Sequence, residues 1–452
     1  MISASAGGAP LRPEPSPEDA AASSWRRADL ERRLHQALAL ASRTLDAAQS
    51  PDERVMGDAL PSSVRPLVLA KVVAEAGILL RCAARASAAD GTHGSALAAA
   101  VDALAIQLAS LARGEPVLVR LCSEPACAIE HATAHLYLTD IGYRDDAFDR
   151  FLQQILDGER TGGAERLPSH ALEHHWLEQI RSGAAATQPI DAALLAATCA
   201  GAPLDVLGAS TLDLYAFTHV VLYATDMGRR GAPWPRPVGE IAAEAEAALA
   251  AALDADNFDL AAELLWTWPM LGLPWSAAAN FAFQVLAAAQ DDHGFLPGPQ
   301  YADLASAQRD DGVLRTSYHA NVVLGILCAV ALLPGRAPAR TVAAAPADTT
   351  PVDGLLRLLA PSSRSPRWLA MQAALAPSGR AALAPFVLSI VLRRAAAAHD
   401  IERVRTGLQA ALEGGWADGP AVGQALALLR RVTALARWRN AVPNEASGHA
   451  AP

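Results

Sequence analysis

Tyr137-Leu-Thr-Asp-Ile-Gly142 recurs in the chain as Tyr223-Ala-Thr-Asp-Met-Gly228, and each copy ends an apolar segment with the period of a helix. A repeated helix ending indicates a repeated helical hairpin, so the pair predicts a solenoid or a closed ring of helices. Alanine and leucine dominate, and no alternating segment of strand length is flanked by hairpin turns. We therefore expect an all-α protein with both Thr-Asp corners at the same end of a ring.

The domain organisation follows from composition and helix count. Residues 1–24 are Pro-rich and predict a disordered tail, and residues 441–452 predict a second one. Between residues 25 and 335, about a dozen helices with short connections predict an α/α toroid-like ring of helical hairpins. Residues 336–351 are expected to be a linker, and residues 352–440 a C-terminal helical segment.

Composition excludes several classes of function. The net charge of −10 argues against a nucleic-acid partner, because no basic excess exists to neutralise phosphates. Lys71 is the only lysine, so there is no P-loop, and Schiff-base chemistry would rest on this residue within an apolar helix, which the sequence does not favour. The longest apolar stretch, Val322–Leu333, is too short to span a bilayer, and no secretory signal is visible. These features predict a cytoplasmic protein without a membrane partner.

The second Thr-Asp corner carries the main candidate site. His219, Tyr223 and Asp226 stand at i, i+4 and i+7, and therefore face one side of a helix. A histidine can transfer a proton, a carboxylate can orient it, and a phenol can donate to a developing oxyanion. The alternative is that His219 and Tyr223 are core residues and that Asp226 braces the corner. Asp140, from the first corner, is expected to join the same cleft.

Two other clusters could bind metal ions. His131 and His135 have the helical spacing of two metal ligands, but they lack the glutamate of a His-Glu-x2-His motif. Asp145, Asp146 and Asp149 match the Asp-Asp-x-x-Asp spacing of a Mg²⁺-diphosphate site, but acidic residues are also favoured at a helix N-terminus. We expect structural histidines and a capped helix, with no bound transition metal and no cofactor.

Two resemblances extend this interpretation. The segment Gln290–Phe295 resembles the turn between helices of terpene-cyclase and prenyltransferase toroids, although His293 stands where an aspartate is expected and the aromatic residue comes one position early. Over roughly residues 30 to 335, the chain resembles an uncharacterised actinobacterial family with a Thr-His-x3-Tyr-x-Thr-Asp-x-Gly signature, here Thr218–Gly228, and a later Tyr318-His319 pair. That resemblance implies a helical fold and a setting in natural-product biosynthesis.

Three functions are compatible with these patterns. The first is a tailoring enzyme of bacterial specialised metabolism that performs non-redox acid-base chemistry, such as cyclisation, elimination or isomerisation, on a small molecule or peptide. In it His219 acts as base or acid, Asp226 orients it, and Tyr223, Tyr318, His319 and Asp140 complete the cleft. The second is a non-catalytic scaffold that binds a peptide or partner. The third is a terpenoid cyclase-like enzyme that uses the Asp145–Asp149 carboxylates.

Overall fold

The computed structural model describes residues 25–50, 67–89, 95–158, 165–301, 304, 309–339, 348–359 and 365–441. Among these residues the chain is helical and contains no β-strand, which confirms the all-α class. The predicted tails, apart from Ala441, lie outside the described residues, as do residues 340–347 of the predicted linker. A helix already begins at Thr350, inside that linker.

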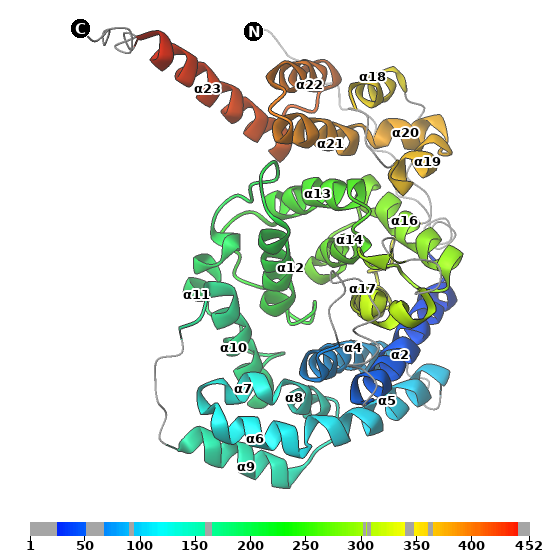
Figure 1. The fold of residues 1–452 in the computed structure, drawn as a ribbon, viewed down its shortest axis with the longest axis vertical. Coiled ribbons are helices and arrows are strands. Elements are labelled where there is room, and N and C mark those ends of the chain that lie inside the picture. Colours follow the sequence, from blue (N-terminus) through cyan, green and yellow to red (C-terminus); the bar gives the residue numbers. More distant parts are fainter. Residues whose placement is uncertain are drawn as a thin grey trace, which may run out of the picture.

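Six helices form an inner layer, in which each helix contacts the next one and the last contacts the first (Figure 1). In the order of contact they are α4 (Leu69–Ala89), α8 (Thr133–Asp140), α10 (Pro168–Arg181), α12 (Thr211–Thr225), α14 (Phe258–Leu265) and α17 (Arg309–Ala331). This closed cycle is compatible with the expected ring of hairpins, and assignment to the α/α-toroid architecture stays a prediction.

The helices that precede these in the chain lie outside the ring (Figure 1). They are α2 (Arg27–Gln49), α5 (Ala96–Ala112), α9 (Asp146–Asp157), α11 (Ala192–Ala197), α13 (Val238–Asp254) and α16 (Ala277–His293). Shorter helical segments complete this part of the chain: α6 (Glu115–Ser123), η1 (Pro125–Cys127), α7 (Ala128–His131), η2 (Cys199–Gly201) and α15 (Thr267–Leu271). Inner and outer helices therefore alternate along the sequence.

Local sequence sets the helix ends. Ser210 accepts from the backbone N–H of Asp213, whose side chain accepts in return from the backbone N–H of Ser210, and this capping box begins α12. Ser276 and Asn257 cap α16 and α14 in the simpler way. Gly325 of α17 allows the closest approach of the inner and outer layers, because an added Cβ would lie 2.6 Å from the Cβ of Ala37.

Helix α17 combines length with a long apolar segment. Its segment Gly312–Ala331 is long and apolar enough to cross a membrane, and α5 with α6 would pass the same test only as one span bent by 48°. However, 78% of the α17 window is buried inside the protein, where the helix packs against α2, α4 and α14. Packing within the ring therefore accounts for its composition.

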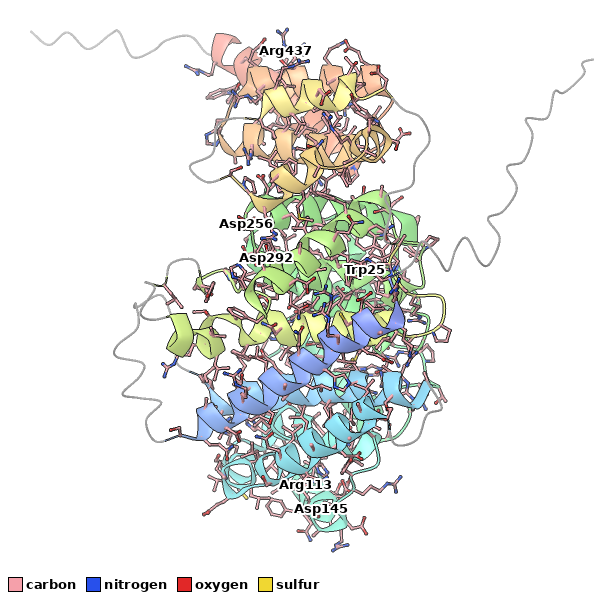
Figure 2. The ribbon with its side chains drawn as sticks, turned by 90° about the vertical axis from the view of Figure 1, so that its right-hand side faces the viewer. Trp25, Arg113, Asp145, Asp256, Asp292 and Arg437 are labelled. Carbon is pink, nitrogen blue, oxygen red and sulfur yellow. The ribbon has the colours of Figure 1, made fainter. Side chains whose placement is uncertain are left out.

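The C-terminal helices stack on one side of the ring, against α13 and α16 (Figure 2). They are α18 (Thr350–Leu358), α19 (Arg367–Ala373), α20 (Pro377–Ala382), α21 (Ala384–Ala397), α22 (Ile401–Gly414) and α23 (Pro420–Ala441). Arg394 donates two hydrogen bonds of 2.7 Å to Asp254 at the end of α13, and Trp368 donates a third. The far half of α23 extends away from the rest of the molecule (Figure 1).

Candidate active site in the centre of the ring

The two Thr-Asp corners meet at one arginine of α4. Arg81 donates from Nε to Asp140 at 2.8 Å and from Nη1 to Asp226 at 2.6 Å. Trp176 of α10 also donates its indole N–H to Asp226, at 2.9 Å. Asp226 itself has a left-handed backbone conformation (φ 47°), which ends α12 and turns its carboxylate toward α4. Both corners therefore lie at the same end of the ring, as the repeat predicts.

This arginine cluster, which comprises Arg81, Arg85, Asp140 and Asp226, is a closed structural unit. Arg81 and Asp226 have no exposed side-chain surface. Burial favours a protonated carboxyl, but Arg81 and Arg85 outweigh it and hold the pKa of Asp226 below its usual value. The hypothesis that Asp226 orients His219 is therefore wrong. Beyond the last turn of α12 the chain adopts a left-handed conformation, so the carboxylate does not continue the helical stripe on which that hypothesis relied.

The centre of the ring contains a cavity of about 240 Å³, which we call the chamber. All six inner helices line it, and the polar side chains are contributed by different helices. Its apolar lining includes Ile78, Leu222 and residues of α17. Its polar lining includes His219, Tyr223, Glu263, Glu173 and His319. Three of the predicted site residues, His219, Tyr223 and His319, therefore share one cavity.

His319 forms an ion pair with a carboxylate that sequence reasoning did not single out. Its Nδ1 lies 2.7 Å from Oδ1 of Asp259 on α14, and Tyr215 donates to the other oxygen of Asp259 at 2.6 Å. Burial by itself would lower the pKa of His319, but Asp259 and Glu75 raise it to about 10. His319 is thus an imidazolium at neutral pH, and its Nε2 remains directed toward Glu75 at 3.5 Å.

Glu263 and His219 form the second pair of the chamber. Oε2 of Glu263 lies 3.7 Å from Nε2 of His219 and 2.5 Å from the hydroxyl of Thr218. Only 1% of the Glu263 side chain is exposed, and this burial raises its pKa to about 8. Burial and the charge of His319 lower the pKa of His219 to about 4. His219 lies deep inside the ring, yet 42% of its side chain is accessible because it borders the chamber.

Tyr223 lies between the chamber and the arginine cluster. Its ring centroid is 5.8 Å from that of His219 and 5.0 Å from that of Trp176. Burial and the nearby Glu173, to which it is hydrogen-bonded, raise its pKa well above the usual value. Tyr223 therefore remains a neutral phenol, as the candidate role of a hydrogen-bond donor requires.

A second cavity, of about 310 Å³, adjoins the chamber, and we call it the vestibule. Lys71 and His319 line both cavities. Tyr318, another predicted site residue, lines the vestibule, where burial and the charge of Glu75 raise its pKa. The ammonium of Lys71 lies 3.5 Å from Oε1 of Glu75, one turn further along α4. The vestibule is the more polar of the two cavities and extends to the first turn of α4.

The two histidines near the first corner contact different side chains. His131 contacts Glu124 at 2.8 Å, whereas His135 contacts Asp149 at 2.8 Å and Arg113 at 3.0 Å. These contacts agree with structural histidines, because each ring is held by its own neighbours.

The Asp-Asp-x-x-Asp segment begins α9, on the outside of the ring (Figure 1). Asp145 accepts from two backbone N–H groups and caps this helix. The segment therefore lies in the outer layer, away from the chamber. In the part of the chain that the structure describes, no group of three histidine, cysteine or acidic side chains could hold a metal ion.

Sequence reasoning missed the carboxylates of the chamber. Asp259 and Glu263 have the i, i+4 spacing on α14, and Lys71 and Glu75 have it on α4. Both pairs interrupt apolar stretches of their helices. A charged pair on one face of a buried helix needs a partner or a cavity, and this was the available signal.

The fold and site can now be compared with known proteins. A family model described as a domain of unknown function (DUF6895) matches residues 34–329. The match runs from α2 to α17 and so includes the ring and both cavities, and the chain belongs to this family. No curated protein and no solved structure is significantly similar to the chain.

Proposed function

We propose that the protein is an enzyme that catalyses proton transfer on a small molecule bound in the chamber. The observation that carries this proposal is the pairing of Glu263 and His219, 3.7 Å apart, at the wall of a cavity inside the ring. The two groups have opposite displacements of pKa, with Glu263 raised to about 8 and His219 lowered to about 4. Two titratable groups whose environments move their pKa values apart in this way are a usual arrangement for an acid and a base.

The protonation states assign the roles. At neutral pH His219 is uncharged and can remove a proton, whereas Glu263 is protonated and can donate one. His319 is an imidazolium fixed by Asp259, so its Nε2 can stabilise negative charge that develops on a substrate oxygen. Tyr223 is a neutral donor in the lining of the same chamber. Asp226 and Asp140, which sequence analysis placed in the site, instead hold the corners together.

The size and lining of the chamber bear on the substrate. A volume of about 240 Å³ accommodates a small molecule, and the apolar lining residues Ile78, Leu222 and those of α17 suit a hydrocarbon portion beside the acid and base. Elimination, isomerisation and cyclisation all need such a proton donor and acceptor across one substrate. Specialised metabolism as the setting stays a prediction from the sequence resemblance.

The direct test is exchange of carbon-bound hydrogen. The purified protein is incubated in D₂O with a panel of small aldehydes, ketones and 2-oxo acids, and loss of the α-proton signals is followed by ¹H NMR. We expect exchange on at least one compound, lowered roughly a hundredfold or more by His219→Ala or Glu263→Gln. The matched controls are His293→Ala and Glu178→Gln, which remove a solvent-facing histidine and a surface carboxylate. Tight binding of a compound without exchange would instead support a binding protein.

The pH dependence of the exchange rate is a second test. The base must be unprotonated and the acid protonated, so the rate should rise with an apparent pKa of about 4 and fall with one of about 8. Glu263→Gln should remove the decrease on the alkaline side from whatever activity remains. A profile that rises through the ordinary histidine pKa near 6.5 would show that the pKa of the base is not lowered as it is for His219 in this structure.

A further inference from the structure

Lysine usage in this chain is extreme. Lysine and arginine total 37 residues, and only one of them, Lys71, is a lysine. That residue lines both the vestibule and the chamber. If only a positive charge were needed at this position, arginine could supply it as it does elsewhere in the chain. An arginine cannot act as a nucleophilic amine, because its guanidinium stays protonated.

The surroundings of Lys71 suit an amine that has to lose and regain protons. Its ammonium lies 3.5 Å from Oε1 of Glu75, and the same oxygen lies 3.5 Å from Nε2 of the His319 imidazolium. Lys71 is also in the first turn of α4, where it lines both cavities. Its side chain is 60% exposed, so a small carbonyl compound in the vestibule can reach it. Glu75 stands one helical turn from Lys71 in the sequence, and the fold adds His319.

We propose that the ε-amine of Lys71 forms an imine with the carbonyl carbon of a small aldehyde or ketone. This inference rests on the proposed proton-transfer function, to which it adds the substrate class. Glu75 takes a proton from the ammonium, and the freed lone pair of Nζ attacks the carbonyl carbon. His319 protonates the carbonyl oxygen to give a carbinolamine. The nitrogen returns a proton to His319, Glu75 gives its proton to the hydroxyl, and the C–O bond breaks with release of water. In balance, the ammonium and the carbonyl compound give a protonated imine and one water, without any oxidant or reductant.

The imine explains why an amine and an acid-base pair share connected cavities. A protonated imine withdraws electrons from its α-carbon, so a proton on that carbon becomes easier to remove. His219 is the neutral base on the chamber side of Lys71, and Glu263 can return a proton to another position of the substrate. Hydrolysis of the imine by the reverse of its formation then frees the product and restores the ammonium.

Reductive trapping tests the proposal without requiring turnover. The full chain is incubated with pyruvate, or separately with benzaldehyde, in the presence of sodium cyanoborohydride. Intact mass and peptide mapping then count and locate the adducts. Arg405→Lys provides an internal reference, because position 405 on α22 is 71% exposed and would carry the only other lysine. We expect one fast adduct at Lys71, and trapping slowed roughly a hundredfold by Glu75→Gln.

The outcomes separate this proposal from the proposed function. Trapping at Lys71 no faster than at the reference lysine, or unchanged by Glu75→Gln, would overturn the imine. Full deuterium exchange in Lys71→Arg would overturn the imine and leave the acid-base pair standing. Fast trapping with no exchange on any compound would support the imine and contradict proton transfer. His219→Ala should still be trapped at Lys71, because the base acts only after the imine has formed.

Discussion

The charged residues near the two ends of the buried part of α4 have different surroundings. At the far end, Arg81 is enclosed by two aspartates and the Trp176 ring, and neither Arg81 nor Asp226 has any exposed side-chain surface. One to three turns earlier, Lys71 and Glu75 border open space, together with a histidine that is 28% exposed and another that is 42% exposed. The charged groups of the first cluster pair with one another, whereas those of the second cluster line cavities.

This difference separates a structural role from a chemical one. A buried ion pair that is complete in itself has little left to offer a ligand, and it mainly fixes the position of the elements that carry it. Groups at the lining of a cavity keep unused donors, acceptors and protons, and burial raises the pKa of Glu263 and lowers that of His219. Asp226 belongs to the arginine cluster, whereas Tyr223, from the same Thr-Asp segment, lines the chamber. Only their surroundings show which residue has which role.

The largest effect is expected from breaking the arginine cluster. Asp226→Ala leaves the guanidinium of Arg81 buried without its main counter-charge, so the free energy of unfolding should fall by about 3–5 kcal/mol. Asp140→Ala should cost less, because Asp140 is 19% exposed and water can replace part of its contact. Urea unfolding of both variants measures this. Equal and small effects would mean that the corners are not held by Arg81.

A smaller, pH-dependent effect is expected at the chamber. Burial raises the pKa of Glu263 from 4.5 to about 8, so the folded chain keeps a proton that the unfolded chain releases. Its contribution to stability is complete below pH 4.5 and is lost as pH rises to about 8, by at most about 1.4 kcal/mol per pH unit. Glu263→Gln lacks this loss and should gain stability relative to the wild type over that range.

Urea unfolding at a series of pH values measures this gain, with Glu178→Gln as the control for removal of a surface carboxylate. A difference between Glu263→Gln and the wild type that does not change with pH would show that Glu263 has an ordinary pKa. In that case Glu263 would be ionised at neutral pH, and the chamber would differ less from the arginine cluster.

The smallest effect is expected for Tyr215→Phe. The change removes a 2.6 Å hydrogen bond to Asp259 at the rim of the vestibule, where water can enter, and should cost about 1 kcal/mol. His319 should keep its proton, because Oδ1 of Asp259 still contacts it at 2.7 Å. ¹⁵N NMR of the imidazole reports this protonation state. Loss of the proton at neutral pH would show that the three groups act as one cooperative network.

The sequence predicts the helical class and the meeting of the corners because both depend on local patterns. The apolar period identifies the helices, and the repeated Thr-Asp ending indicates equivalent positions in a repeated hairpin. It does not predict that Arg81 joins the corners, because α4 and the two corners are far apart in the chain. An arginine within the apolar segment Gly77–Ala84 was the only local indication.

Part of the candidate site was predicted because it also depends on local sequence patterns. His219 and Tyr223 were found because they stand on one helical face, and His319 because it occurs in a Tyr-His pair. Asp226 was assigned to the wrong cluster, since helical geometry was extended past a residue that has a left-handed conformation. Asp259 and Glu263 belong to no motif. Their role comes from the closed packing of α12, α14 and α17, which only tertiary structure reveals.

The buried arginine cluster also determines how molecules reach the chamber. Tyr137 and Tyr223 line the chamber, Trp176 packs against both rings, and Arg81 lies behind them, 5.9 Å from the ring of Tyr137 and 5.5 Å from that of Trp176. On that side these side chains close the ring, so the chamber does not run through it. We expect a molecule that enters through the vestibule to leave past Lys71 and His319 again. Departing product and arriving substrate would then compete for the same passage, and product should inhibit competitively.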